Sequence, residues 1–341
     1  MNKKRNTIST GQYIFGILSF LLVWAFFAGN YFNEDYENYV DAFYMGIDRY
    51  ADLKIEPLFA LITHSFQKAG INDFFLFRSI IAFVFMIPYW YVLITKSDKA
   101  IWSIIIYIPL FLLNIVILRN FMAFSIAMIG MLFLYKGGKK NKLIFLAFLL
   151  IAEGIHNLMF VYLLLLLLDV DLKLLKRPIL YFILCCIVGV LLSTFITETI
   201  SNLETTKYSS SELGRSIRVI LGVPLLINYL FMKYVYKNST ESPNENIKKF
   251  ERGVLRTNLI MIAVVCFFTI NINSSRLNMN LFVLNSVFIA NRLLRHKRDC
   301  GIMIPLSFFV IGLQWYYMCA FVLGIQFEEL FKYNYFFNFG F

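Results

Sequence analysis

Long apolar runs without charge recur along the whole chain and predict its secondary structure. No charged residue occurs between Ala100 and Leu118, or between Asn120 and Tyr135. A helix needs about 20 such residues to cross the roughly 30 Å hydrocarbon core of a bilayer. The apolar run from Tyr13 to Ala28 follows a basic N-terminus but precedes no clear small-x-small cleavage site. We therefore interpret it as a retained first span rather than a secretory signal.

Two segments depart from a simple alternation of spans and loops. The apolar part of "EPLFALITHSFQ" (56–67) is too short to span, which predicts a re-entrant or interfacial helix on the outer side. The run from Leu143 to Leu168 is basic at both ends, so we expect it to enter the membrane and return, turning near "EGIH" (153–156). A single long span is the alternative, and it would place one basic loop outside. With the hairpin, the chain makes about 11 crossings, with its N-terminus inside and its C-terminus outside.

Composition supports an all-α polytopic membrane protein. Hydrophobic residues make up 59% of the 341 residues and charged residues only 16%, with a mean hydropathy of +0.68. Soluble domains contain about 45–50% apolar residues. We expect one integral-membrane domain over 1–341. Its larger hydrophilic parts are an outer acidic and aromatic loop with a short helix (31–73), an outer loop (199–214) and a cytoplasmic loop (237–256).

The net charge of +11 is best explained by membrane topology. Lysine and arginine collect in segments that the positive-inside rule assigns to the cytoplasm, which makes a nucleic-acid partner unnecessary. These segments are Lys3–Arg5, Lys96 and Lys99, "KGGKKNK" (136–142), Lys173 to Arg177, the 233–256 loop, and Arg292–Arg298. The five cysteines form no C-x-x-C or Cys/His pattern, so neither a disulfide framework nor a zinc site is indicated. We expect no metal and no cofactor.

Most basic residues on the expected outer side are arginines. They are Arg49, Arg78, Arg119, Arg215, Arg218 and Arg276. The planar guanidinium fork suits phosphate oxygens, whereas lysine is a point charge. Arginines that open several spans at the outer membrane level therefore predict a site for an anionic, lipid-linked group. For any one of them, the alternative is a side chain that snorkels to lipid headgroups.

The outer segment "NEDYENYVDAFYMGIDRYADLKIEP" (33–57) is rich in acids and tyrosines. Carboxylates accept hydrogen bonds from sugar hydroxyls and tyrosine rings stack on pyranose faces, so a sugar-binding role is expected, with a plain solvated loop as the alternative. Near the turn of the expected hairpin, His156 follows Glu153 on one helical face. A neutral imidazole there could accept a proton from a sugar hydroxyl. The alternative is a polar residue that satisfies its own turn.

The order of these features resembles the EpsG family of polysaccharide polymerases, also called Wzy-like. The resemblance rests on "NEDYENYVDAFY", "EPLFALI", "LRNFMAFSIAM", "LLIAEGIHNLMF" and "SSRLNMNLF", and covers about residues 25–290. Members often carry Gln where this chain has Asn120, and an aromatic residue where it has Asn278. These departures leave the role of the two asparagines open.

The resemblance implies a membrane glycosyltransferase with a GT-C-like fold, in the bacterial plasma (inner) membrane with its active face outward. It would transfer the growing glycan from undecaprenyl diphosphate to the next lipid-linked repeat unit. Its partners would be these lipid-linked oligosaccharides, membrane lipids, and the chain-length regulator and flippase of the pathway. The sugars, the linkage, the oligomeric state, and the choice between O-antigen, lipopolysaccharide, capsule and exopolysaccharide cannot be read from the sequence.

The chemistry of such a transfer assigns roles to individual residues. A leaving diphosphate needs charge stabilisation, for which we expect Arg119 and Arg276, supported by Arg215 and Arg218. His156 is the expected general base, with Asp35 or Glu56 as the next choices. The expected sugar-binding residues are Tyr36, Tyr39, Asp41 and Glu153.

Two other functions fit parts of the pattern. A flippase or transporter of lipid-linked sugars would also use arginines at the membrane surface, but it usually shows internal repeats, and we find none. A membrane acyltransferase that modifies the polysaccharide would suit one outward-leaning histidine. The excess of arginines over histidines favours the polymerase.

Overall fold

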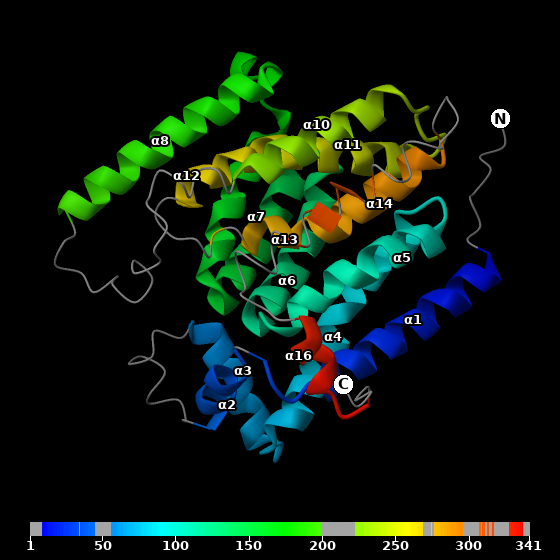
Figure 1. Ribbon diagram of the computed structural model, residues 1–341, viewed down its shortest axis with the longest axis vertical. Coiled ribbons are helices and arrows are strands. Elements are labelled where there is room, and N and C mark those ends of the chain that lie inside the picture. Colours follow the sequence, from blue (N-terminus) through cyan, green and yellow to red (C-terminus); the bar gives the residue numbers. More distant parts are fainter. Residues whose placement is uncertain are drawn as a thin grey trace.

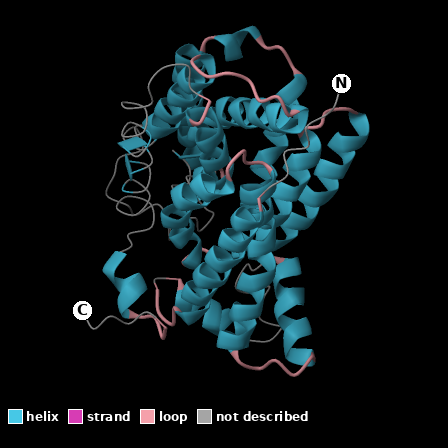
Figure 2. Ribbon diagram, turned by 90° about the vertical axis from the view of Figure 1, so that its right-hand side faces the viewer, coloured by secondary structure: helices cyan, strands magenta, loops and turns pink. Residues whose placement is uncertain are grey.

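A computed structural model describes residues 9–33, 35–44, 56–199, 222–268, 274, 276–295 and 327–336, with a few single positions between 307 and 316. Within these ranges every regular element is a helix, as Figure 2 shows, and the only β pairing is an isolated antiparallel bridge between Asn30 and Asn334. The expectation of an all-α protein is confirmed for the part of the chain that is described.

The helices follow one another as labelled in Figure 1. They are α1 (Thr10–Gly29), α2 (Tyr36–Tyr44), α3 (Pro57–Lys68), α4 (Phe74–Thr95), α5 (Ala100–Phe111), η2 (Leu112–Ile115), α6 (Leu118–Leu134), α7 (Lys139–Ile155), η3 (Asn157–Asp169), η4 (Lys173–Lys176), α8 (Pro178–Thr199), α10 (Val223–Lys237), α11 (Glu245–Ile260), η7 (Met261–Val264), α12 (Val265–Phe268), α13 (Arg276–Asn280), α14 (Phe282–Leu293) and α16 (Phe327–Lys332).

Two of these helices, α1 and α4, are long and apolar enough to cross a membrane. Four other apolar helical stretches are shorter: Ala100–Ile115, Leu118–Leu134, Asn157–Asp169 and Phe282–Leu293. Large apolar side chains are exposed on the outward faces of α1, α4 and α8, among them Leu18, Ile87 and Leu191. Such faces suit contact with hydrocarbon. The count of about 11 crossings stays a prediction.

The helix α6 forms the centre of the core. Most of its side chains are buried, and it packs along α7 and against α4. Gly130 makes the close approach to α7 possible, because a Cβ atom there would lie 2.9 Å from Cβ of Phe148. The first turn of α6 carries Arg119, so the packing of this helix fixes the place of the first candidate site residue.

The segment from 139 to 169 is a hairpin rather than a single span. The helix α7 ends at Ile155, His156 has an extended backbone (φ −154°, ψ 111°), and η3 then returns. Lys142 near the start of α7 is paired with Asp169 at the end of η3, at 2.9 Å between Nζ and Oδ2. The helix α7 has 17 residues and η3 has 13. Because an α-helix rises about 1.5 Å per residue and a 3₁₀-helix about 2.0 Å, the two arms of the hairpin are nearly equal in length. The two segments therefore form a hairpin, as expected, and its entry into and return from the membrane stays a prediction.

The segment after Glu56 forms a short helix, α3, of 12 residues, and its re-entrant or interfacial placement on the outer side stays a prediction. It begins with Pro57 directly after Glu56, and proline is favoured at the first helical position. Its Leu58 packs against α7 at Gly154, where an added Cβ would lie 3.1 Å from Cβ of Leu58. This contact brings the start of α3 to the turn of the hairpin. In Figure 1, α2 and α3 lie together at the lower end of the molecule, beside α16.

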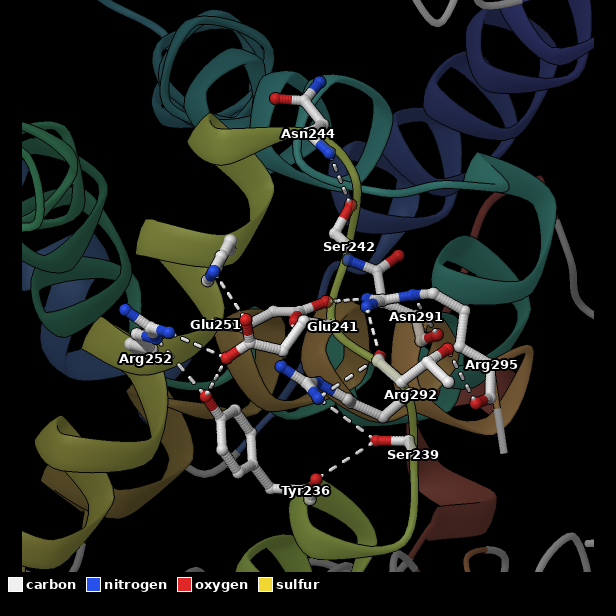
Figure 3. A network of polar contacts seen from close by, with 12 residues as sticks. Tyr236, Ser239, Glu241, Ser242, Asn244, Glu251, Arg252, Asn291, Arg292 and Arg295 are labelled. Atoms are coloured by element: carbon white, nitrogen blue, oxygen red, sulfur yellow. Dashed lines mark hydrogen bonds and ion pairs between the residues drawn. The ribbon is translucent and has the colours of Figure 1, made fainter. Parts of the chain in front are cut away.

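At the far end of α14, a buried network holds basic residues of the segment 292–298, which the positive-inside rule assigned to the cytoplasm (Figure 3). Arg292 and Glu251 are both fully buried and pair at 2.5 Å between Nη2 and Oε2. Arg295 bonds the other oxygen of Glu251 and also pairs with Asp98 at 2.9 Å. The network therefore ties α14 to α11 and to the turn between α4 and α5. A single sequence gives no sign that Glu251 is the buried counter-charge.

Candidate functional site

Glu56 lies at the centre of the polar cluster that the structure forms from the predicted residues. Its carboxylate accepts from Nη1 of Arg119 at 2.6 Å and contacts Nδ1 of His156 at 3.0 Å. The backbone N–H of Asn157 donates to the same oxygen as His156, at 3.2 Å. Glu56 is only 8% exposed. One buried carboxylate thus joins the start of α3, the start of α6 and the turn of the α7–η3 hairpin.

The electrostatics of this cluster fix two protonation states. Burial alone would raise the pKa of Glu56, but the hydrogen bond from His156 and the charge of Arg119 outweigh it and lower this pKa to about 2. Burial lowers the pKa of His156, opposed by Glu56 and assisted by the charges of Arg119 and Arg276. At neutral pH the carboxylate is therefore ionised and the imidazole neutral.

These states decide the tautomer of His156. An ionised carboxylate can only accept, so Nδ1 of His156 must carry the proton and donate it to Glu56. The other ring nitrogen, Nε2, then carries the lone pair. A carboxylate that orients a histidine in this way leaves Nε2 ready to take a proton from a substrate hydroxyl.

Arg119 remains open to a ligand although it is paired with Glu56. Its guanidinium carbon lies 5.8 Å from the ring centre of Tyr39 and 5.9 Å from that of Phe59. About 30% of its side chain is exposed. A guanidinium has five N–H donors, so pairing with one carboxylate leaves capacity for phosphate oxygens. The two rings hold the group in place without neutralising it.

Arg276 opens α13 and joins the cluster from another direction. Its Nη1 lies 3.7 Å from Oδ2 of Asp35, a contact too long for a hydrogen bond. Its Nε is buried without a hydrogen-bond partner among the described residues, as is Oδ1 of Asn278. Burial raises the pKa of Tyr39, opposed by the charges of Arg119 and Arg276, so this tyrosine lies within reach of both arginines. Within the described part of the chain, α13 therefore carries a buried donor and a buried acceptor without a hydrogen-bond partner.

A pair of buried amides sets the separation of the two arginines. Asn120 directly follows Arg119, and Asn280 lies one turn after Arg276 on α13. Their side chains exchange two hydrogen bonds, of 2.7 and 3.2 Å. Tyr162 of η3 further anchors α13 by donating to the carbonyl of Leu277 at 2.9 Å. The sequence alone assigns no role to Asn120, and the structure gives it a positioning role.

Other predicted residues lie elsewhere. Asp41 is exposed on α2 and Glu153 is exposed on α7. The expected placement of Glu153 and His156 on one helical face is wrong, because α7 ends at Ile155 and the extended backbone turns His156 away. Tyr36 lies on the side of α2 near Arg78, with the guanidinium 5.6 Å from its ring. Arg49, Arg215 and Arg218 lie outside the described residues.

Arg78, which carries the same sequence signal as Arg119, is a structural residue. It is almost fully buried, donates to the carbonyl of Asn30, and donates to that of Ile115 at 3.3 Å. Its guanidinium also lies 4.9 Å from the ring of Phe27. Arg78 therefore satisfies the carbonyls at two chain reversals, and no bound anion is needed to explain it.

Sequence reasoning missed the links that hold the site together. The backbone N–H of Asn157 and the ring of Phe59 carry no signal that would distinguish them from neighbouring positions. Only the sequence "RN" in 119–120 and the repeated asparagines of "NMN" (278–280) marked polar positions in apolar surroundings. Among the described residues, no group of three or more His, Cys, Asp or Glu side chains could hold a metal ion.

Comparison with known proteins agrees with the resemblance and extends it. A model of the EpsG family matches residues 13–337, beyond the stretch that the short motifs cover. No curated protein and no solved structure matches the chain. The family and the apolar helices together indicate a membrane protein of polysaccharide biosynthesis. The chain belongs to the EpsG family.

Proposed function

We propose that the protein is a metal-independent glycosyltransferase that polymerises lipid-linked oligosaccharide repeat units. It would act at the outer face of the bacterial plasma membrane, with undecaprenyl diphosphate as the lipid carrier. The observation that carries the proposal is the bridging of Arg119 and His156 by Glu56, since it places an anion-binding group beside a proton acceptor. Transfer from a sugar diphosphate needs an anion-binding group for the leaving diphosphate and a proton acceptor for the attacking hydroxyl.

The donor end of the reaction uses the arginines. Arg119 and Arg276 would bind the diphosphate of the growing chain, and Nε of Arg276, which has no hydrogen-bond partner among the described residues, would give one donor for it. As the bond between the anomeric carbon and the phosphate oxygen breaks, its electron pair leaves with the diphosphate. Preorganised donors in a site sheltered from water stabilise that charge most effectively.

The acceptor end uses the dyad of Glu56 and His156. A hydroxyl at the non-reducing end of the next lipid-linked unit attacks the anomeric carbon, forming the new glycosidic bond. Its proton passes to Nε2 of His156, and the resulting imidazolium is stabilised by the ionised Glu56. Asp35 and Glu56 were the alternative bases. The low pKa of Glu56 makes it a weak base and an effective orienting group.

The test is polymerisation by the purified chain in lipid nanodiscs, with lipid-linked repeat units as substrate. We expect a ladder of products from the wild type and only single repeats from Arg119→Ala and His156→Ala. Arg177→Ala and His64→Ala provide matched controls away from the site, and they should leave the ladder unchanged. A full ladder from a correctly folded His156→Ala protein would contradict the mechanism.

Deletion in the host separates the three candidate functions. Loss of polymerisation leaves single-repeat surface glycans. Accumulation of single-repeat lipids on the cytoplasmic side would instead indicate a flippase. Full-length chains that lack acyl groups would indicate an acyltransferase.

A further inference from the structure

An open groove of about 670 Å³ lies on another side of α2, next to the start of α4 and the C-terminal segment 333–336. Its lining is mainly aromatic, with one acid. The residues that matter are Tyr36, Tyr44, Asp73, Phe75, Tyr335 and Phe336. No step of the proposed transfer uses this groove.

Two of the aromatic rings are exposed, yet their backbone is firmly held. Tyr335 is 66% exposed and Phe336 is 62% exposed. Between α1 and these rings, Asn334 is fully buried and its Nδ2 donates to the carbonyl of Phe26 at 2.7 Å. The N–H of Tyr335 donates to the carbonyl of Gly29 at 2.9 Å. The fold thus holds two large rings at the surface as a fixed platform.

Exposed rings fixed in this way indicate a ligand that covers them. Apolar surface is stabilised by removal from water, so a rigid exposed platform is costly unless it is covered in use. Lipid headgroups are one possible cover, since tyrosine is common at membrane interfaces. Asp73 instead favours a sugar as the group that covers the rings. Its Oδ1 caps α4 by accepting from Phe75 at 2.8 Å, and the exposed carboxylate repels anionic headgroups but accepts from sugar hydroxyls.

The helix α2 connects this groove to the candidate site. Tyr36, Val40 and Tyr44 recur every four residues and line the groove. Asp35 and Tyr39 face Arg276 and Arg119 instead. Because a helix with its side chains is about 10 Å across, a glycan of a few sugars reaches from one side of α2 to the other.

We propose that this groove binds the growing glycan while its diphosphate is held by Arg119 and Arg276. The proposal rests on the proposed function, because that function supplies the glycan. Aromatic faces would stack on the pyranose rings, and Asp73 would accept hydroxyl hydrogen bonds. The groove would then favour long chains over single repeats as donors.

The experiment measures direct binding, so that it does not depend on catalysis. The probe is the lipid-free oligosaccharide released from the host's own polysaccharide, with its reducing end reduced so that no transfer can occur. Calorimetry with the full chain in nanodiscs should show binding by the wild type. We expect about tenfold weaker binding for Tyr335→Ala and for Asp73→Asn, and nearly normal binding for Tyr335→Phe.

Controls separate this proposal from the transfer mechanism. Tyr234→Ala removes an exposed tyrosine (52%) outside the groove and should bind as the wild type does. Arg119→Ala and His156→Ala should also bind the lipid-free probe, even where they form no ladder. Absence of binding by the wild type, or normal binding by a folded Tyr335→Ala, would overturn the proposal. So would a Tyr335→Ala protein whose only defect is weaker association with lipid.

Discussion

Asn120 and Asn280 exchange two hydrogen bonds in the core, and each lies within one turn of an arginine of the candidate site. The pair joins α6 to α13, two helices about 160 residues apart in the sequence. Buried amide pairs specify relative helix position, because removing either partner leaves the other without a hydrogen bond.

The amide pair can be tested by a double-mutant cycle. Asn120→Ala or Asn280→Ala should each lower the free energy of unfolding by about 1 kcal/mol, since each leaves an unpaired buried amide. The double variant should cost less than the sum of the two. Thermal unfolding in nanodiscs measures this, and the product ladder reports whether the arginines have separated. Strictly additive losses would show that the two side chains do not interact.

Glu56 should set both the rate and its pH dependence. The neutral form of His156 is the base, so transfer should fall on the acid side as His156 gains a proton, at a pH below the ordinary histidine range. Glu56→Gln removes the carboxylate that raises the pKa of His156, so the acid limb should move to lower pH. The plateau should fall about 100-fold or more, because the imidazole is no longer oriented.

The measurement is the initial rate of transfer across the acid range for both proteins. A plateau that falls without any movement of the acid limb would mean that His156 is not the titrating base. Glu56→Asp keeps the negative charge beside His156, so its acid limb should lie between those of the wild type and of Glu56→Gln.

The buried network at the end of α14 should govern stability and not chemistry. Glu251→Ala leaves Arg292 buried without its counter-charge, which typically costs about 3–5 kcal/mol. We expect a large fall in melting temperature and in membrane level. Glu245→Ala, an exposed acid on the same helix, serves as the control and should change little. Normal stability of Glu251→Ala would show that the pair contributes little.

The turn of the α7–η3 hairpin should face outward. A cysteine at position 153, made by Glu153→Cys in a background without other reactive thiols, should react with a membrane-impermeant maleimide in intact cells. Reaction only after the inner face is opened would reverse the assigned orientation of the hairpin and of the site at its turn.

Much of the architecture follows from local pattern. The long apolar helix α1, the short helix after Glu56 and the hairpin can each be recognised as apolar runs in the sequence, because each depends on nearby residues. The 3₁₀ form of η3 is not visible, since its apolar sequence suits an α-helix equally well.

The site was predictable as a set of residue types but not as a set of partners. Arg78 and Arg119 both stand in or beside long apolar runs, yet one is buried against carbonyls and the other is open. The difference depends on Glu56, 63 residues away from Arg119. Such pairings arise from packing of distant helices, which a single sequence does not encode in any local pattern.

The bridge between Asn30 and Asn334 has a consequence for synthesis on the ribosome. The end of α1 emerges among the first parts of the chain, whereas the segment that it pairs with is translated some 300 residues later. Until then, the carbonyl of Gly29 lacks the hydrogen bond from Tyr335 and is solvated by water or by the insertion machinery. The aromatic platform is therefore completed last, so a nascent chain stalled before residue 334 inserts its early helices but lacks that surface.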